Sequence, residues 1–315
     1  MLAEVVRSGL TESRHRASVV VLDPDGRVLR AAGQVTAPFF PRSVNKPMQA
    51  AAMLRAGLDL DGALLALAAA SHSGEDFHVG GVREILSRAG LTEEDLRCPP
   101  SLPLDDQAAA AVLHHGGQAS RRYMNCSGKH AAMLATCVRG GWPTASYLDP
   151  DHPLQRSIRG AVAGLAGEPV TACGVDGCGA PLFALSLTGV ARALQALIIA
   201  PPLSPERRVA DAFRAYPAWT SGSRRPERAL MAAVPGLLLK SGAEGVEGFA
   251  LADGRAVAYK IEDGAGRPRP ALSAALLRWL DAGGPDAAPV LAALGEVPVL
   301  GGGHPVGSVR VTLPW

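Results

Sequence analysis

The alternation of hydrophobic and polar positions changes along the chain from a strand pattern to a helical pattern and back. Short apolar runs typical of β-strands occupy both ends of the sequence. Asp23–Gly26 and Asp253–Gly254 are turn sequences between such runs, so the strands they join should be antiparallel. We expect strands over residues 2–8, 17–23, 27–33, 236–242, 246–252, 255–262 and 307–313.

The middle of the chain has helical spacing, interrupted by polar and glycine-rich loops. We expect helices from Ser43 to about Gly57, over 61–70, after the loop at 71–76, from Thr92 to Cys98, over 105–113, up to Val138, and over 151–165, 187–198, 204–215 and 272–281, with a short strand over 169–173. This order predicts an α+β fold (an α/β sandwich), with helices flanking an antiparallel sheet. Residues 1–315 should form one unit. Its sheet lobe comes from about 1–40 and 236–315, its helical lobe from about 43–235, and a cleft separates the two.

Composition narrows the function classes. The chain has 315 residues, 48% of them hydrophobic, and a net charge of +2, so it is globular and has no electrostatic case for binding nucleic acid. We find no apolar run of 18 residues, and the N-terminus reads as a strand rather than a signal peptide, so no membrane association is expected. Five cysteines, an odd number without a regular spacing, favour a cytoplasmic location with thiols that are free or bound to metal.

The strongest candidate for chemistry is the pair Ser43 and Lys46, three residues apart where a helix should begin. Residues at i and i+3 share a helix face, so Lys46 could take the proton of Ser43 while the helix N-terminus faces the group that Ser43 attacks. Ser43 also suits the N-cap position, and Pro47 fits a first turn. An N-cap serine followed by a solvated lysine would give the same pattern.

Two later segments complete a series that serine β-lactamases share, namely S-x-x-K, then S-D-N, then K-T-G. Here Ser71-His72-Ser73 follows in a loop between helices, and Lys240-Ser241-Gly242 ends an apolar strand. The loop with Ser71-His72-Ser73 could instead only cap the helix that follows it. Together they predict a Ser/Lys hydrolytic centre.

In that centre Ser43 attacks a carbonyl, Lys46 is its base, and Ser73 relays a proton from Lys240 to the leaving group. Burial and the charge of Lys240 should lower the pKa of Lys46. The Ser43 N–H, with another from 236–246, would hold the oxyanion.

With these segments the chain resembles the rhizobial-type L-asparaginases, also called class 3 or the asparaginase II family, which are related in fold to serine β-lactamases and glutaminases. The resemblance spans nearly the whole chain. It rests on Glu4-Val5-Val6-Arg7-Ser8-Gly9, Phe40-Pro41-Arg42-Ser43-Val44-Asn45-Lys46-Pro47-Met48-Gln49-Ala50, Ala70-Ser71-His72-Ser73-Gly74-Glu75, Asn125-Cys126-Ser127-Gly128-Lys129-His130, Gly174-Val175-Asp176-Gly177-Cys178-Gly179-Ala180-Pro181 and Lys240-Ser241-Gly242-Ala243-Glu244-Gly245.

The resemblance implies hydrolysis of L-asparagine to L-aspartate and ammonia by a homodimer with two Ser–Lys pairs. These pairs fall on Ser43 with Lys46 and on Ser73 with Lys240, where Ser71 is the alternative to Ser73. We expect the substrate to be bound by Arg42, His72, Asp176 and Arg225.

The family also carries a zinc ion held by two cysteines, a lysine and water, and these ligands fall on Cys126, Lys129 and Cys178. The spacing is not a standard zinc signature, and two buried cysteines would look the same. The resemblance therefore implies a Zn²⁺ site, which would order the active site and recognise the polar end of the substrate.

One region departs from the family pattern. The family usually has Gly-Arg-x-Asp-Thr before a Leu-Met pair, where this chain has Arg224-Arg225-Pro226-Glu227-Arg228-Ala229-Leu230-Met231. Arg225 keeps its place as a possible ligand of the substrate carboxylate, or it is a surface arginine. The alternatives to an asparaginase are another amidase of the same scaffold (a glutaminase or a β-lactam hydrolase) and a catalytically silent binding domain.

Overall fold

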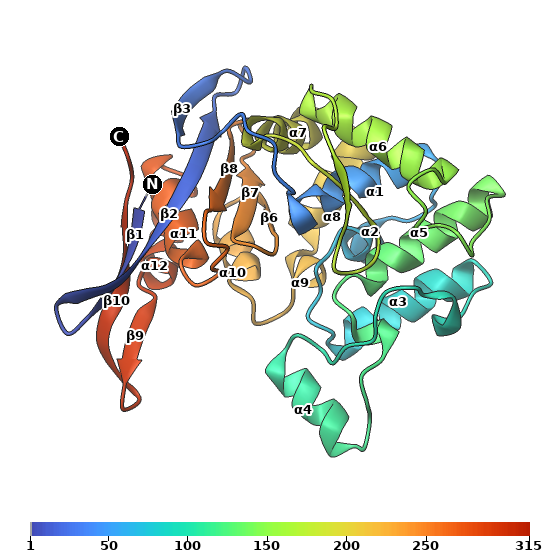
Figure 1. Cartoon of the computed structure of the whole chain (residues 1–315), viewed down its shortest axis with the longest axis horizontal. Coiled ribbons are helices and arrows are strands. Elements are labelled where there is room, and N and C mark those ends of the chain that lie inside the picture. The colour runs from blue at the N-terminus through green and yellow to red at the C-terminus, as the bar shows by residue number, and fades with distance from the viewer. Residues whose placement is uncertain (1) are drawn as a thin grey trace.

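A curled antiparallel sheet and a body of helices make up the protein (Figure 1), and the computed structural model describes residues 2–315. The strands of this sheet lie in the order β6-β7-β8-β2-β1-β10-β9, and β3 also pairs with β2. Their bounds are β1 Leu2–Arg7, β2 Leu10–Leu22, β3 Val28–Ala32, β6 Leu238–Ser241, β7 Val246–Ala250, β8 Ala256–Ile261, β9 Pro298–Gly301 and β10 His304–Thr312. The prediction of an antiparallel sheet with flanking helices, built from both chain ends, is confirmed. The division into two lobes stays a prediction.

Strand β2 joins the two halves of this sheet and is longer than predicted. Residues 17–22 are buried between β3 and β8, while 10–16 pair with β1 and are more exposed. No strand was predicted over 10–16, because its polar side chains lack the buried-strand pattern. Hydrogen bonding to β1 keeps this segment extended despite its polarity.

The helices form most of the remaining chain. Their bounds are α1 Lys46–Arg55, α2 Gly62–Ala68, α3 Asp76–Arg88, α4 Asp106–His114, α5 Ser127–Gly140, α6 Pro153–Ala166, α7 Leu187–Ile199, α8 Pro205–Ala215, α9 Pro217–Thr220, α10 Pro226–Ala233, α11 Arg269–Trp279 and α12 Gly284–Gly295, with 3₁₀ turns η1 Arg42–Asn45, η2 Glu93–Asp95 and η3 Arg121–Tyr123. None of the helices in 2–315 is long and apolar enough to cross a membrane.

Several elements differ from the prediction. The strand expected over 169–173 begins only at Cys173. It forms β4 (Cys173–Val175), which pairs with β5 (Pro181–Phe183) in a hairpin separate from the main sheet. Helices α9, α10 and α12 and strand β9 were not predicted, because their short or Pro-rich and Gly-rich sequences show little periodicity.

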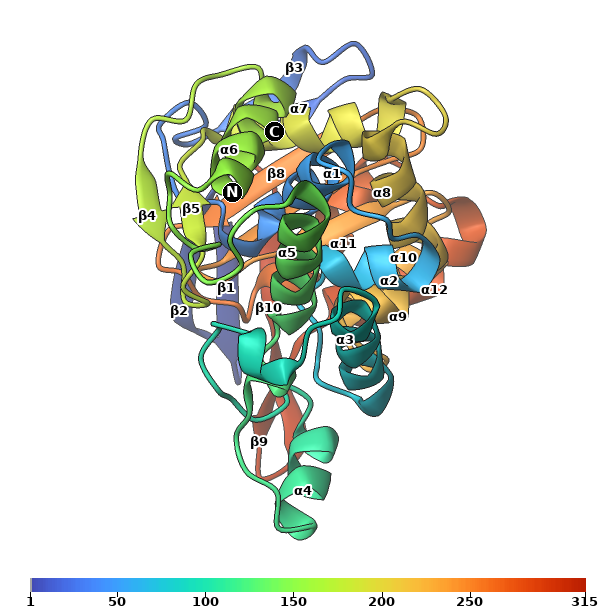
Figure 2. The same cartoon turned by 90° about the vertical axis from the view of Figure 1, so that its right-hand side faces the viewer.

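Helix α1 lies at the centre of the helical body and carries the residues of the first motif. All of its residues except Arg55 are buried, and it packs against α5, α6, α7 and α8 (Figure 2). A 3₁₀ turn precedes it, so Pro41 occupies the N-cap position of η1 and the N-cap role predicted for Ser43 is wrong. This extra turn places Ser43 outside the regular helix.

Helix α5 lies so close to α2 that one position tolerates only glycine. A Cβ on Gly128 would lie 2.6 Å from the Leu67 carbonyl oxygen. We expect Gly128→Ala to lower the free energy of unfolding by about 2 kcal/mol or more, because backbone must move to relieve the clash. The control is Gly160→Ala in α6, where a Cβ meets nothing within 4 Å. It should raise the free energy of unfolding by about 0.5–1 kcal/mol. Urea denaturation measures both, and equal effects would contradict the packing argument.

Candidate active site

Lysine is rare in this chain, and three of the four lysine side chains are buried in the same region. The sequence contains four lysines and, among its 31 basic residues, 27 arginines (31 − 4). Lys46, Lys129 and Lys240 are only 1%, 2% and 3% exposed. Buried lysine shifts its pKa far more readily than arginine does. The three buried lysines therefore mark the first region to consider for chemistry.

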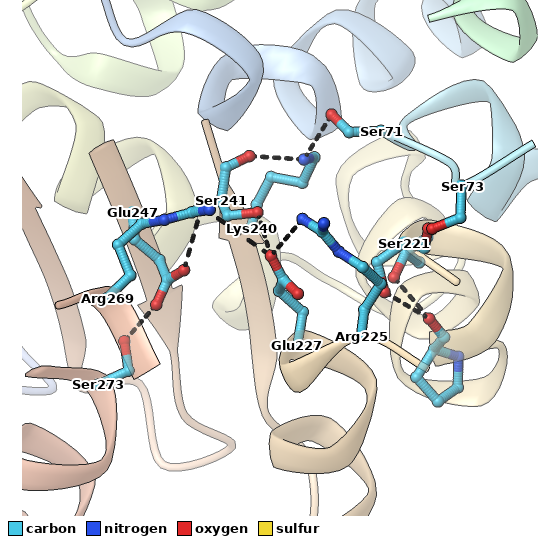
Figure 3. Close-up of polar contacts among 12 residues, drawn as sticks. Ser71, Ser73, Ser221, Arg225, Glu227, Lys240, Ser241, Glu247, Arg269 and Ser273 are labelled. Atoms are coloured by element: carbon cyan, nitrogen blue, oxygen red, sulfur yellow. Dashed lines mark hydrogen bonds and ion pairs between the residues drawn. The ribbon is translucent and has the colours of Figure 1, made fainter. Parts of the chain in front are cut away.

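Lys46 and Lys240 converge on the hydroxyl of Ser71. Lys46 Nζ donates to Ser71 Oγ at 2.9 Å and to the Ala70 carbonyl oxygen at 2.6 Å. Lys240 Nζ donates to Ser71 Oγ at 2.9 Å and to the Ser241 carbonyl oxygen at 2.7 Å (Figure 3). The two amines thus reach one serine from α1 and from β6, the edge strand of the sheet that faces the helices.

The surroundings of Lys240 disfavour a charged amine. Burial, and then the neighbouring Lys46, lower the pKa of Lys240 well below its ordinary value. This lowered pKa of Lys240 was not predicted from the sequence. A hydroxyl that contacts one neutral amine and one charged amine can accept a proton from the second and pass its own to the first.

The predicted contact between Ser73 and Lys240 is wrong. Ser73 is buried, and its hydroxyl donates to the Ser221 carbonyl oxygen at 2.8 Å. Gly222 packs so tightly here that a Cβ on it would lie 2.2 Å from Ser73 Oγ. The hydroxyl of Ser71, which is partly exposed, takes the place predicted for that of Ser73. Two serines separated by one residue give no sequence signal that distinguishes them.

Ser43 lies at the junction between η1 and the end of β6. A Cβ on Gly242 would lie 3.3 Å from the Ser43 nitrogen, so the two backbones are in close contact. The predicted hydrogen bond between Ser43 and Lys46 is absent, since no residue within 2–315 hydrogen-bonds to Ser43 Oγ and Lys46 turns to Ala70 and Ser71. Ser43 therefore presents a partly exposed, unused hydroxyl beside the lysine cluster.

Arg42 and Asp176, both predicted to bind substrate, form an ion pair. Arg42 Nε donates to Asp176 Oδ1 at 2.8 Å, and Arg42 Nη1 lies 3.7 Å from Glu244 Oε1. Arg42 has φ +49°, a left-handed conformation that costs energy for a residue with a Cβ. The ion pair to the β4–β5 loop holds this conformation next to Ser43.

The other two predicted substrate ligands are placed differently. His72 is fully buried: the Gly74 N–H donates to Nδ1 at 3.1 Å, so the Nε2–H must donate to Ser127 Oγ at 2.8 Å. Burial holds the pKa of His72 well below its ordinary value, so its ring is neutral. Direct substrate contact by His72 is therefore not supported. Arg225 is half-buried and donates to Glu227 Oε1 at 3.1 Å.

The three predicted zinc ligands come together from α5 and the β4–β5 loop. Lys129 Nζ lies 3.3 Å from Cys178 Sγ, and both cysteines are buried. The neighbouring Cys126 thiol lowers the pKa of Cys178, and Lys129 and His130 lower it further, which favours the thiolate form of Cys178. His130, whose ring nitrogen Nδ1 bonds to the Tyr147 hydroxyl at 2.6 Å, is a neighbour that the sequence analysis missed.

These residues fit a zinc ion in chemistry. Two sulfur ligands and one nitrogen ligand suit Zn²⁺ and leave a position for water, provided that Lys129 is neutral. Across residues 2–315, no group of three His, Cys, Asp and Glu side chains could hold a metal. The site therefore depends on Lys129 as a ligand.

A buried network of ionic groups, which was not predicted from the sequence, continues from Ser241. Ser241 Oγ donates to Glu227 Oε1 at 2.6 Å, and Arg269 Nη1 lies 3.9 Å from Glu227 Oε1 and 3.8 Å from Glu247 Oε2 (Figure 3). The Tyr259 hydroxyl donates to Glu247 Oε1 at 2.9 Å. Buried carboxylates of this kind have no periodic signature, because their role depends on partners far away in sequence.

The fold and this cluster define a class, a mixed α and β protein with a buried serine–lysine site where helices meet a sheet edge. The family model described as L-asparaginase II matches residues 3–311, and the chain belongs to this family. Membership implies asparagine hydrolysis, so the protein is an amidohydrolase with a small-molecule substrate. A comparison with curated proteins finds no significant match.

Solved structures share parts of the architecture. A β-lactamase from Mycobacterium bovis is 19% identical, with a TM-score of 0.48 over 84% of this chain and 94% of that one. The hydrolase EstCE1, described as having promiscuous acyltransferase activity, is 16% identical, with a TM-score of 0.42 over 81% and 91%. A putative β-lactamase from Bacteroides dorei is 14% identical, with a TM-score of 0.41 over 81% and 87%. With TM-scores below 0.5, these likenesses carry no conclusion about activity.

Proposed function

We propose that the protein hydrolyses L-asparagine to L-aspartate and ammonia through a serine nucleophile activated by two lysines. The observation that supports this most directly is the convergence of Lys46 and Lys240 on Ser71, each with its Nζ 2.9 Å from Oγ. Ser71 thus replaces Ser73 as the second serine of the proposed mechanism. Family membership supports the substrate.

The proposed reaction begins with a proton shift. Lys46 passes a proton to Ser71, and Ser71 passes its own to the neutral amine of Lys240, which leaves Lys46 neutral. Ser43 then attacks the side-chain carbonyl carbon of asparagine, and neutral Lys46, turning from Ser71 to the Ser43 hydroxyl, takes its proton. When the carbon–nitrogen bond breaks, Lys46 returns this proton to the nitrogen, which leaves as ammonia. Water next attacks the aspartyl ester on Ser43, gives one proton to Lys46, and L-aspartate leaves as Ser43 regains its proton.

The backbone next to Ser43 suits an oxyanion. Within 2–315, the N–H groups of Ser43 and Ala243 make no hydrogen bond, and the two segments meet at Gly242. Donors of this kind stabilise the charge that develops on the carbonyl oxygen. Arg42 would bind the substrate carboxylate, and Asp176 would bind its amino group.

Cys126, Lys129 and Cys178 would hold the zinc ion. When bound, zinc would act as a Lewis acid that orients a polar group of the substrate. Asp176 contacts both regions, because its carboxylate pairs with Arg42 and lies 3.7 Å from Cys178 Sγ. The rhizobial-type assignment, the homodimer and the cytoplasmic location stay predictions.

The test measures ammonia release from L-asparagine and L-glutamine, and ring opening of a chromogenic β-lactam. We expect a clear preference for L-asparagine. Acid quenching during turnover, followed by peptide mass spectrometry, should find an aspartyl ester on the peptide with Ser43. An ester on the peptide with Ser71 would reassign the nucleophile, and no ammonia from L-asparagine would overturn the proposal.

A further inference from the structure

Glu227 is buried next to β6, the strand that carries Lys240 and Ser241. Its Oε1 accepts hydrogen bonds from Ser241 Oγ at 2.6 Å and from Arg225 Nη2 at 3.1 Å, and Arg269 lies on its other side (Figure 3). Its side chain is only 7% exposed. Burying a carboxylate is costly, and the bonds to Oε1 offset part of that cost, whereas Oε2 has no hydrogen-bond partner among residues 2–315.

Glu227 is also ionised. Although burial opposes its charge, Arg225, the Ser241 hydroxyl and Arg269 lower its pKa to about 2. It lies in the first turn of α10, where the helix N-terminus favours negative charge. The proposed function does not use this charge.

Ser241 connects Glu227 to Lys240 through a bond at each end. Glu227 holds the Ser241 hydroxyl, while Lys240 Nζ donates to the Ser241 carbonyl oxygen at 2.7 Å. A shift of Ser241 would therefore move the acceptor that fixes the Lys240 amine. The same bonds bring the negative charge of Glu227 close to that amine.

The charges that face Lys240 come from three directions. Lys46 on α1 and Arg225 at the start of α10 disfavour a charged amine, while Glu227 on α10 and, if ionised, Cys126 ahead of α5 favour it. Behind them, Arg269 on α11 and Glu247 on β7 contact Glu227 or each other rather than Lys240. Glu227 and Arg225 are thus opposed charges on one helix turn.

We propose that Glu227 is a positioning residue: through Ser241 it holds the carbonyl oxygen that fixes the Lys240 amine, and with Arg225 it places two opposed charges beside that amine. This inference rests on the proposed function, in which neutral Lys240 accepts a proton from Ser71. It gives the unusual Arg225-Pro226-Glu227 segment a role beyond substrate contact.

The first test is the pH dependence of kcat/KM for L-asparagine. Glu227→Gln removes a charge that favours protonated Lys240, so Lys240 stays neutral to lower pH. The acid limb should move to lower pH by roughly 0.5–1 unit. Arg225→Gln removes an opposing cation and should move the limb to higher pH. The double variant removes both opposed charges and should return towards the wild type, while Arg269 keeps its ion pair with Glu247.

Glu247→Gln is the matched control, since it removes a buried carboxylate of the same network that does not face Lys240. Its acid limb should stay within about 0.2 unit of the wild type. A merely structural role of Glu227 would change kcat/KM without moving the limb, and would affect Glu247→Gln in the same way. Either result would overturn the proposal.

The second test needs no substrate. With four lysines in the chain, ¹³C-lysine labelling gives few enough resonances for NMR to follow Lys240 directly, after assignment with Lys240→Arg. All variants are compared at the same zinc content. A titration of Lys240 that moves down in Glu227→Gln and up in Arg225→Gln supports the proposal, and an unmoved titration overturns it. If the protein is inactive on L-asparagine but this titration moves, the effect of Glu227 and Arg225 on Lys240 is supported and only the proposed function is contradicted.

Discussion

Replacing Ser71 by alanine is expected to lower kcat/KM for L-asparagine by about 10³-fold. The change removes the hydroxyl that both Lys46 and Lys240 contact at 2.9 Å, so the proton can no longer pass between them. Positioned proton transfer contributes about 10² to 10⁴ to rate. Most of the loss should fall on kcat, because Ser71 acts in the reaction rather than in ground-state binding. Steady-state ammonia release measures it.

Ser73→Ala is the matched control, two residues away in the same loop. It removes a buried hydrogen bond to the Ser221 carbonyl oxygen and should lower the free energy of unfolding by about 1–2 kcal/mol. The value of kcat/KM should fall by less than about tenfold. If Ser73→Ala were the inactive variant and Ser71→Ala the active one, the serine assignment would be reversed.

The second large effect concerns the metal. Cys178→Ser is expected to lower the zinc content of the purified protein from about one ion per chain to less than a tenth of that. Serine at neutral pH keeps its proton and cannot replace the thiolate that the neighbouring Cys126 thiol and Lys129 stabilise. Metal analysis by mass spectrometry after dialysis gives the zinc content without relying on activity.

Cys137→Ser provides the comparison, because Cys137 is a buried cysteine of the same helix as Lys129 but no proposed ligand. It should keep its zinc. Zinc retained in Cys178→Ser, or absent from the wild type purified with zinc present, would rule out the proposed ligand set.

Much of the fold follows from periodicity, and the failures have physical causes. Strands β6, β7 and β8 are buried apolar runs with a clear turn between the last two, and were predicted within about two residues. The Ser43 helix was predicted, but not its division into η1 and α1, since the preceding 3₁₀ turn depends on packing against Gly242.

The site was only partly predictable for a different reason. Motif spacing identified Lys46 and Lys240 because one lies at the start of a helix and the other at the end of a strand, and both positions are marked in the sequence. Motif spacing could not distinguish Ser71 from Ser73. In the folded chain the Ser73 hydroxyl donates to the Ser221 carbonyl oxygen, which leaves the Ser71 hydroxyl to contact the lysines. The importance of Glu227 was equally hidden, because its partners Ser241 and Arg269 become neighbours only in the folded chain.

The scarcity of lysine also decides how the protein can be attached to a surface or polymer. Three of its four lysine side chains are buried, so amine-directed coupling to lysine reaches only Lys260. Lys260 lines the same cavity, of about 360 Å³, as Arg42 and Phe40. A polymer coupled to lysine would therefore gather beside Arg42, the neighbour of Ser43, and coupling through the exposed thiol of Cys173 would also place it close to Asp176. A cysteine introduced on the exposed face of α4 is the better attachment point, because α4 projects away from the lysine cluster.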